Sequence, residues 1–221
     1  MERLSRYLST TGRDVPKALE LYEYNVQLSE VLYGILHGLE VSVRNAEHFA
    51  LTASYKTPNW YDGALMSRPA VPLSPYWSDQ LVKAKAKAIA PATPTVALRP
   101  GKVIAELTFG FWIDLLKNQN HWSLWIGKKL HTAFPNARRH RGLIHDRLKA
   151  IQLLRNRISQ HEPVLTAANA LYTGDGVITL PEVLECVEWV CMDTAQWIRA
   201  VFRYADAEGI LRTVAAMKIS L

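Results

Sequence analysis

Residues 18–51, ALELYEYNVQLSEVLYGILHGLEVSVRNAEHFAL, decide the fold of this chain. Asp14 precedes this run as a helix N-cap, so we predict one long helix over about 15–55. Gly34 and Gly38 inside it predict either a kink or close packing against a neighbour. Apolar side chains recur there every three or four residues, which places them on one stripe of a helix: Leu32, Ile35, Leu36, Leu39, Val43, Ala46 and Ala50.

Helical periodicity also dominates the rest of the chain, which predicts an all-α fold and a single helical domain over residues 1–221. Proline-rich loops are expected at about 56–75 and 91–101, and TGDGVITLP (173–181) predicts a brief strand or hairpin. The other predicted helices are a short one before Asp14 and those at about 76–90, 102–117, 121–133, 142–161 and 181–204, with a short C-terminal helix completing 181–221.

Composition limits the class of protein. The chain is 49% hydrophobic and 21% charged, which is typical of a globular domain. No run reaches the ~18 apolar residues of a membrane span, and the first residues lack the apolar core of a signal peptide. We therefore expect a cytoplasmic protein without membrane contact, in which Cys186 and Cys191 are reduced core residues.

Positive charge is concentrated in one segment. The formal charge is +6, and residues 138–157 hold seven Lys or Arg against a single acid, Asp146. Such a basic segment favours binding to a phosphate backbone, and a solvated helix face is the alternative. No phosphate-binding loop, HExxH or GxSxG motif occurs in the sequence, and no histidine spacing indicates a metal site. We expect neither a metal nor a cofactor.

The predicted helix 142–161 breaks its own apolar pattern. At 100° per residue, Arg155 lies about 40° from Ile151, inside the apolar stripe, as does Arg147. His161 lies on the border of that stripe, and Pro163 predicts that the helix ends near it. A guanidinium on an apolar face is costly without a partner or ligand, so this helix is the candidate site.

These residue types suit phosphodiester chemistry. A histidine at a helix C-terminus can donate a proton to a leaving oxygen, and an arginine can hold a phosphate and its developing charge. On the wheel Arg155 and His161 are about 120° apart, which predicts a site shared by two copies across a two-fold axis. The alternative is structural, with Arg155 paired to a core carboxylate and His161 capping the helix.

Residues 155–161, RNRISQH, have the form R-N-x-x-x-x-H and resemble the signature of HEPN ribonucleases. The run LLRNRISQHEPV (153–164) is similar to the abortive-infection (Abi-like) branch of that family. Three further blocks resemble the same branch in the same order: 18–51, NWYDG (59–63) and ELTFGFWIDLL (106–116).

The resemblance implies a HEPN-like helical bundle with additional helices, forming a homodimer that cleaves RNA without a metal through 2′-hydroxyl attack. Arg155 and His161 would be catalytic and Asn156 would support them. Such proteins are effectors of phage defence or toxin–antitoxin systems, restrained by an antitoxin protein or a noncoding RNA. Pro163 replaces the tyrosine that some HEPN toxins carry as a silencing site.

A second cluster, Arg44 to His48, lies on one face of the long helix and is predicted either to contact RNA or to be an ordinary polar face. Seven tryptophans are expected mostly in the core, and Lys83, Lys85 and Lys87 on a solvated face. The predicted RNA-binding residues are Arg44, His48, Arg138, Arg139, Arg141, Arg147 and Arg157.

Two other functions remain open at this point. A non-catalytic RNA-binding or assembly module could use the same helical scaffold. A regulator that binds duplex DNA through the basic helix would bind DNA and RNA of matched length equally well.

Overall fold

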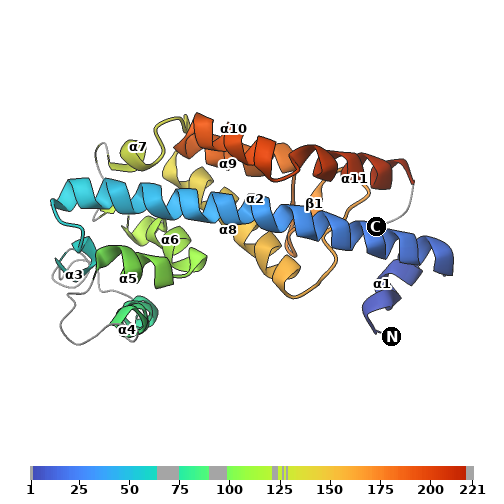
Figure 1. Ribbon diagram of the computed structural model, residues 1–221, viewed down its shortest axis with the longest axis horizontal. Coiled ribbons are helices and arrows are strands. Elements are labelled where there is room, and N and C mark those ends of the chain that lie inside the picture. Colours follow the sequence, from blue (N-terminus) through green and yellow to red (C-terminus); the bar gives the residue numbers. More distant parts are fainter. Residues whose placement is uncertain are drawn as a thin grey trace. The chain divides into compact units, whose positions relative to one another are not determined.

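The computed structural model describes residues 2–63, 75–89, 99–120, 124, 125, 127 and 129–217. These residues are mostly helical, and the sheet within them is one two-stranded hairpin (Figure 1). This confirms the predicted helical class. The elements are α1 (Glu2–Thr10), α2 (Val15–Tyr55), α3 (Trp60–Gly63), α4 (Pro75–Ile89), α5 (Pro100–Glu106), α6 (Phe109–Leu115), η1 (Asn118–Asn120), α7 (Lys129–Ala133), α8 (Arg141–Ser159), β1 (Leu171–Tyr172), β2 (Val177–Ile178), α9 (Leu180–Val190), α10 (Met192–Val201) and α11 (Tyr204–Ala216).

The chain divides into two compact units. Unit 1 comprises residues 1–39, 149–188 and 192–221, and unit 2 comprises residues 40–148 and 189–191. Helices α2, α8 and α9 contribute residues to both units. The expectation of a single domain stays a prediction.

In unit 1 helix α2 packs against the end of α10 and against Phe202, which follows it (Figure 1). An added Cβ at Gly34 would lie 2.6 Å from Cδ1 of Phe202, and one at Gly38 would lie 2.7 Å from Cδ1 of Ile198. Of the two predicted roles for these glycines, a kink or close packing, the structure shows close packing. The buried stripe of α2 in this unit is formed by Leu21, Leu28, Leu32, Ile35, Leu36 and Leu39.

Unit 2 has an aromatic core. The ring of Trp112 lies edge-on to those of Trp60 and Phe111, with centroids 6.1 and 5.4 Å apart. Trp77, Trp125 and Trp189 are also buried, whereas Trp197 of unit 1 is 54% exposed. The expectation that most tryptophans are core residues therefore holds for the described ones, with Trp197 as the exception. Trp122 lies outside the described residues.

The predicted start of the long helix is confirmed. The backbone N–H of Lys17 donates to Oδ1 of Asp14 over 3.2 Å, which caps the first turn of α2. The predicted hairpin is also present, with Leu171 opposite Ile178 and Tyr172 opposite Val177.

Two predicted helices are each divided. The helix expected at 102–117 breaks because Leu107 is extended and the Thr108 side chain accepts a hydrogen bond from the N–H of Phe111, starting α6. The helix expected at 181–204 breaks at Cys191 and again after α10, and the N–H of Asn136 binds the carbonyl of Trp189 over 3.1 Å. Cys186 is buried as predicted, but Cys191 is only half-buried and lies outside a helix, so its assignment to the core was wrong.

Two predicted loops and one predicted helix lie only partly within the described residues. The loop expected at 56–75 contains α3, and its part at 64–74 lies outside the described residues, as do residues 91–98 of the loop expected at 91–101. Of the helix expected at 121–133, the structure describes a last turn, α7, which ends before Pro135.

Candidate functional site

The end of α8 differs from the prediction. The helix ends at Ser159, and His161 adopts a left-handed backbone with a φ of 57°. The N–H of Glu162 donates to the carbonyl of Arg157 over 2.9 Å, and that of His161 to the carbonyl of Ile158 over 3.0 Å. This is a Schellman-type cap with histidine at the position where glycine is usual.

The left-handed backbone has two consequences. His161 is outside the helix, so its predicted angle of 120° from Arg155 on the wheel was wrong, and the argument for a shared two-fold site based on that angle fails. A non-glycine residue in this conformation costs about 1 kcal/mol, and such strain is concentrated at functional sites. The alternative in which His161 caps the helix is confirmed in part, because the backbone of His161 belongs to the cap of α8.

The segment that carries His161 is held on both sides. Arg157 donates from Nε and Nη2 to the carbonyl of Pro163 over 3.2 and 3.1 Å. The N–H of Val164 donates to Oδ1 of Asn25 on α2 over 2.8 Å. The segment after His161 is therefore held by Arg157 of α8 and by Asn25 of α2, a helix far away in sequence.

The side chain of Arg157 makes further contacts around the turn at His161. Its Nη1 lies 2.9 Å from Oε2 of Glu162, its guanidinium lies 4.6 Å from the ring centroid of Tyr172, and its side chain is 16% exposed. A side chain with these partners is a positioning residue for the turn at His161. It is poorly placed to bind an RNA backbone as predicted from the charge pattern.

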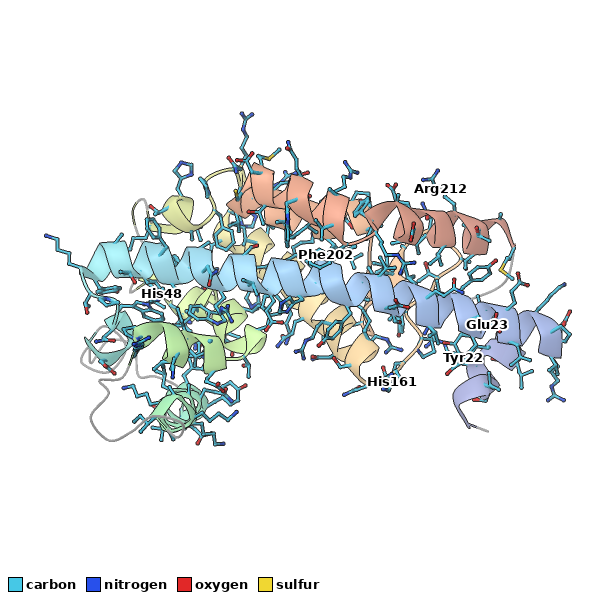
Figure 2. The ribbon with its side chains drawn as sticks, in the orientation of Figure 1. Tyr22, Glu23, His48, His161, Phe202 and Arg212 are labelled. Atoms are coloured by element: carbon cyan, nitrogen blue, oxygen red, sulfur yellow. The ribbon has the colours of Figure 1, made fainter. Side chains whose placement is uncertain are left out.

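A groove of about 610 Å³ opens beside His161, entirely within unit 1. Figure 2 labels two of its residues, Tyr22 on α2 and His161 beyond the end of α8. Its size lies in the range of small-molecule sites. The lining residues are Tyr22, Asn25, Val26, Ser29, Glu30 and Tyr33 from α2, together with Ile158, Ser159 and His161.

Arg155 and Asn156, the other predicted catalytic residues, lie about one turn before the end of α8. Arg155 is half-buried and Asn156 is exposed, and neither lines the groove. The apolar stripe predicted for this helix is confirmed by Ile144, Leu148, Ile151, Leu154 and Ile158, all buried. Arg147 is half-buried at its edge.

The remaining predicted RNA-binding residues near α8 belong to unit 2. Arg138 and Arg139 are exposed, in the segment before α8. Arg141 is half-buried and donates to the carbonyl of Leu116 and, over 3.2 Å, to Oδ1 of Asn118. The basic segment 138–157 is thus not uniformly available, because Arg141 and Arg157 hold backbone carbonyls.

His48 is a structural residue of unit 2. Its Nδ1 accepts a hydrogen bond from Nε1 of Trp60 over 2.9 Å, and burial lowers its pKa below 6.5. It therefore braces α3 as a neutral ring. Arg44 is half-buried, and its Nε donates to Oδ1 of Asn45 over 3.4 Å. Lys83, Lys85 and Lys87 form ion pairs with Asp79, Asp62 and Glu106.

The part of the groove contributed by α2 was not found from the sequence. A signal was present, because Tyr22, Val26 and Tyr33 follow helical spacing on a second face of α2, away from its buried stripe. All three are exposed, at 36%, 48% and 58%. Among the described residues no group of three or more His, Cys, Asp or Glu side chains gathers as a metal site would require, and no helix there is long and apolar enough to cross a membrane.

Comparison of the chain with protein-family models, with curated proteins and with solved structures returns no match. The resemblance to HEPN ribonucleases stays a prediction based on residues 153–164 and the three blocks before them.

Proposed function

We propose that the chain is a metal-independent endoribonuclease that cleaves RNA by attack of a ribose 2′-hydroxyl on the neighbouring phosphate. The observation that carries the proposal is His161, a histidine held in a strained left-handed conformation at the edge of a groove. Imidazole is suited to proton transfer near neutral pH, and RNA supplies the internal nucleophile.

The reaction would need three functions from the chain. The 2′-oxygen forms a bond to phosphorus, and the bond to the 5′-oxygen breaks, leaving a 2′,3′-cyclic phosphate and a 5′-hydroxyl. His161 would give the leaving oxygen its proton, and Arg155 would bind the phosphate oxygens. Glu30 lines the same groove with an exposed carboxylate, 3.4 Å from Nη1 of Arg203, and would accept the proton of the 2′-hydroxyl.

The wider biological role belongs to the same proposal and rests on the resemblance. We propose a cytoplasmic effector of phage defence or of a toxin–antitoxin system, restrained by an antitoxin protein or a noncoding RNA. A HEPN-like bundle and a homodimer are part of this proposal, and measurement of the molar mass in solution tests the dimer. Asn156 would support the site, and Arg138 and Arg139, exposed before α8, would attract the RNA backbone.

The experiment is cleavage of mixed single-stranded RNA in EDTA by the wild-type chain and by His161→Asn. Asparagine tolerates the left-handed backbone, so this variant keeps the cap while removing the imidazole. We expect the thermal midpoint to change little and the cleavage rate to fall by roughly 10²- to 10⁴-fold. The products of the wild-type chain should end in 2′,3′-cyclic phosphate.

Glu30→Gln should lower the rate as well, whereas Glu23→Gln, an exposed carboxyl of α2 outside the groove, should not. Equal cleavage by the wild-type chain and His161→Asn would overturn the proposal.

The second candidate function is a non-catalytic RNA-binding or assembly module. It is favoured by the contacts of Arg157 and by the cap at His161, which give both residues a structural role without any reaction. RNA bound in a salt-dependent way without cleavage would support this module. Equal affinity for duplex DNA and RNA of matched length would instead favour a DNA-binding regulator.

A further inference from the structure

The groove beside His161 combines aromatic, apolar and polar groups. The rings of Tyr22 and Tyr33 are exposed along α2, and Val26 of α2 and Ile158 of α8 supply apolar surface. Ser29 and Ser159 add hydroxyl groups, and Oγ of Ser159 donates to the carbonyl of Arg155 over 3.0 Å. A flat, partly polar ligand matches this lining better than a purely apolar one.

The ring of Tyr22 is supported from behind. Tyr7 of α1 packs edge-on against it, with centroids 5.6 Å apart and planes at 85°. Tyr7 is 2% exposed, and burial, with the neighbouring Tyr22 phenol, raises its pKa to about 12, so it stays neutral. One aromatic wall of the groove is therefore held in place before any ligand binds.

Asn25 supplies a hydrogen-bond donor in the groove. It is 4% exposed, and its Oδ1 accepts from Val164 N–H over 2.8 Å. Its Nδ2 has no hydrogen-bond partner within the described part of the chain, although the residue lines the groove. A nearly buried amide that keeps a donor unused is expected to bind a ligand acceptor or water.

We propose that this groove is a binding site for an unpaired nucleobase of RNA, stacked on Tyr33 and bound through an acceptor atom to Nδ2 of Asn25, with Tyr22 as a second aromatic wall of the groove. The proposal rests on the proposed function only in placing the base next to the phosphate that His161 would act on. Unpaired bases bind proteins by stacking on aromatic side chains and by hydrogen bonds to their edges.

A second copy of the chain is a less suitable occupant. Packing the apolar face of a helix into the groove would remove the hydroxyl of Ser29, the Nδ2 of Asn25 and the exposed carboxylate of Glu30 from water, which is costly for polar groups. A base and its ribose offer hydrogen-bonding atoms as well as a flat surface.

The test is calorimetric binding of adenosine and cytidine 3′-monophosphates, with ribose 5-phosphate and inorganic phosphate as probes that lack a base. We expect at least one nucleotide to bind and both base-free probes to bind much more weakly. Tyr33→Leu should weaken nucleotide binding by roughly 5- to 100-fold. Tyr76→Leu, a matched exposed tyrosine on α4, should leave it unchanged.

Asn25→Asp separates the two roles of Asn25, because the carboxylate keeps an acceptor for Val164 N–H and loses the donor. Circular dichroism tests whether each variant is folded. If Asn25→Asp does not fold, the nucleotide affinity of Tyr33→Leu alone tests the proposed base site. We expect nucleotide binding by Asn25→Asp to be about tenfold weaker.

Equal binding of nucleotides and ribose 5-phosphate, or unchanged binding by Tyr33→Leu, overturns the proposal. So does a Tyr33→Leu variant that loses dimerisation but keeps nucleotide affinity. Because no probe is cleaved, binding without any RNA cleavage leaves the base site standing while the nuclease fails.

Discussion

Glu47→Gln is expected to remove a pH dependence of stability that the wild-type chain carries. Glu47 lies in α2 and is fully buried, and neither carboxylate oxygen has a hydrogen-bond partner among the described residues. Burial raises its pKa well above 4.5, because a charged carboxylate without partners is poorly stabilised in the core.

The direction of the effect follows from proton binding. Above pH 4.5 the unfolded chain has released the proton of Glu47, whereas the folded chain still holds it. The folded state then binds more protons, so the free energy of unfolding falls as pH rises through this window. The slope is about 1.4 kcal/mol per pH unit until the folded carboxyl itself ionises.

Glutamine fills nearly the same volume and does not titrate. Relative to the wild-type chain, Glu47→Gln should therefore gain about 1.4 kcal/mol per pH unit between pH 5 and the raised pKa. At a denaturant slope of about 2.5 kcal/mol per M, this moves the urea midpoint by roughly 0.6 M per pH unit. Urea unfolding of both proteins at pH 5, 6 and 7, followed by tryptophan fluorescence, measures it.

In the difference in unfolding free energy between the wild-type chain and Glu47→Gln, the contributions of the other titrating groups cancel. Glu23→Gln, an exposed carboxyl on the same helix, is the control. If the difference in unfolding free energy between the wild-type chain and Glu47→Gln is the same at pH 5 and pH 7, Glu47 is not a neutral buried acid and the reasoning is refuted.

Four further substitutions test the packing of α2 and α11, the bracing of α3 by His48 and the support of the turn at His161. Gly34→Ala places a Cβ 2.6 Å from an aromatic carbon and should cost about 1–3 kcal/mol in thermal unfolding, whereas Gly209→Ala, with nothing within 4 Å, should stabilise α11 by up to about 1 kcal/mol. His48→Ala leaves Trp60 Nε1 without its acceptor and should cost about 1–3 kcal/mol at pH 8 without changing RNA affinity; loss of RNA affinity in a fully stable variant would contradict the bracing role. Because burial lowers the pKa of His48 below 6.5, its contribution to stability should fall as pH drops through 6.5. Arg157→Ala should lower stability by about 2 kcal/mol, and unchanged urea unfolding would show that its contacts to the turn contribute nothing.

Much of the local structure was predictable because it depends on neighbours in sequence. The apolar stripe of α2, its Asp14 cap and the hairpin after Leu171 follow from helical spacing, N-capping and turn residues. His161 was found as a candidate because Pro163 places it at a helix end. The breaks at Thr108 and Cys191 were missed, because the apolar pattern runs through both.

The sequence by itself determined that this chain forms amphipathic helices and that a histidine lies near the end of α8. Tertiary structure decided what surrounds that histidine. Asn25 and Val164 are bonded across 139 positions of sequence, and the groove needs α2 beside the end of α8. Helical periodicity indicates only which face of a helix is apolar, whereas contacts between residues far apart in sequence depend on how the helices pack. For this reason Arg157, expected from the sequence to contact RNA, instead supports the turn at His161.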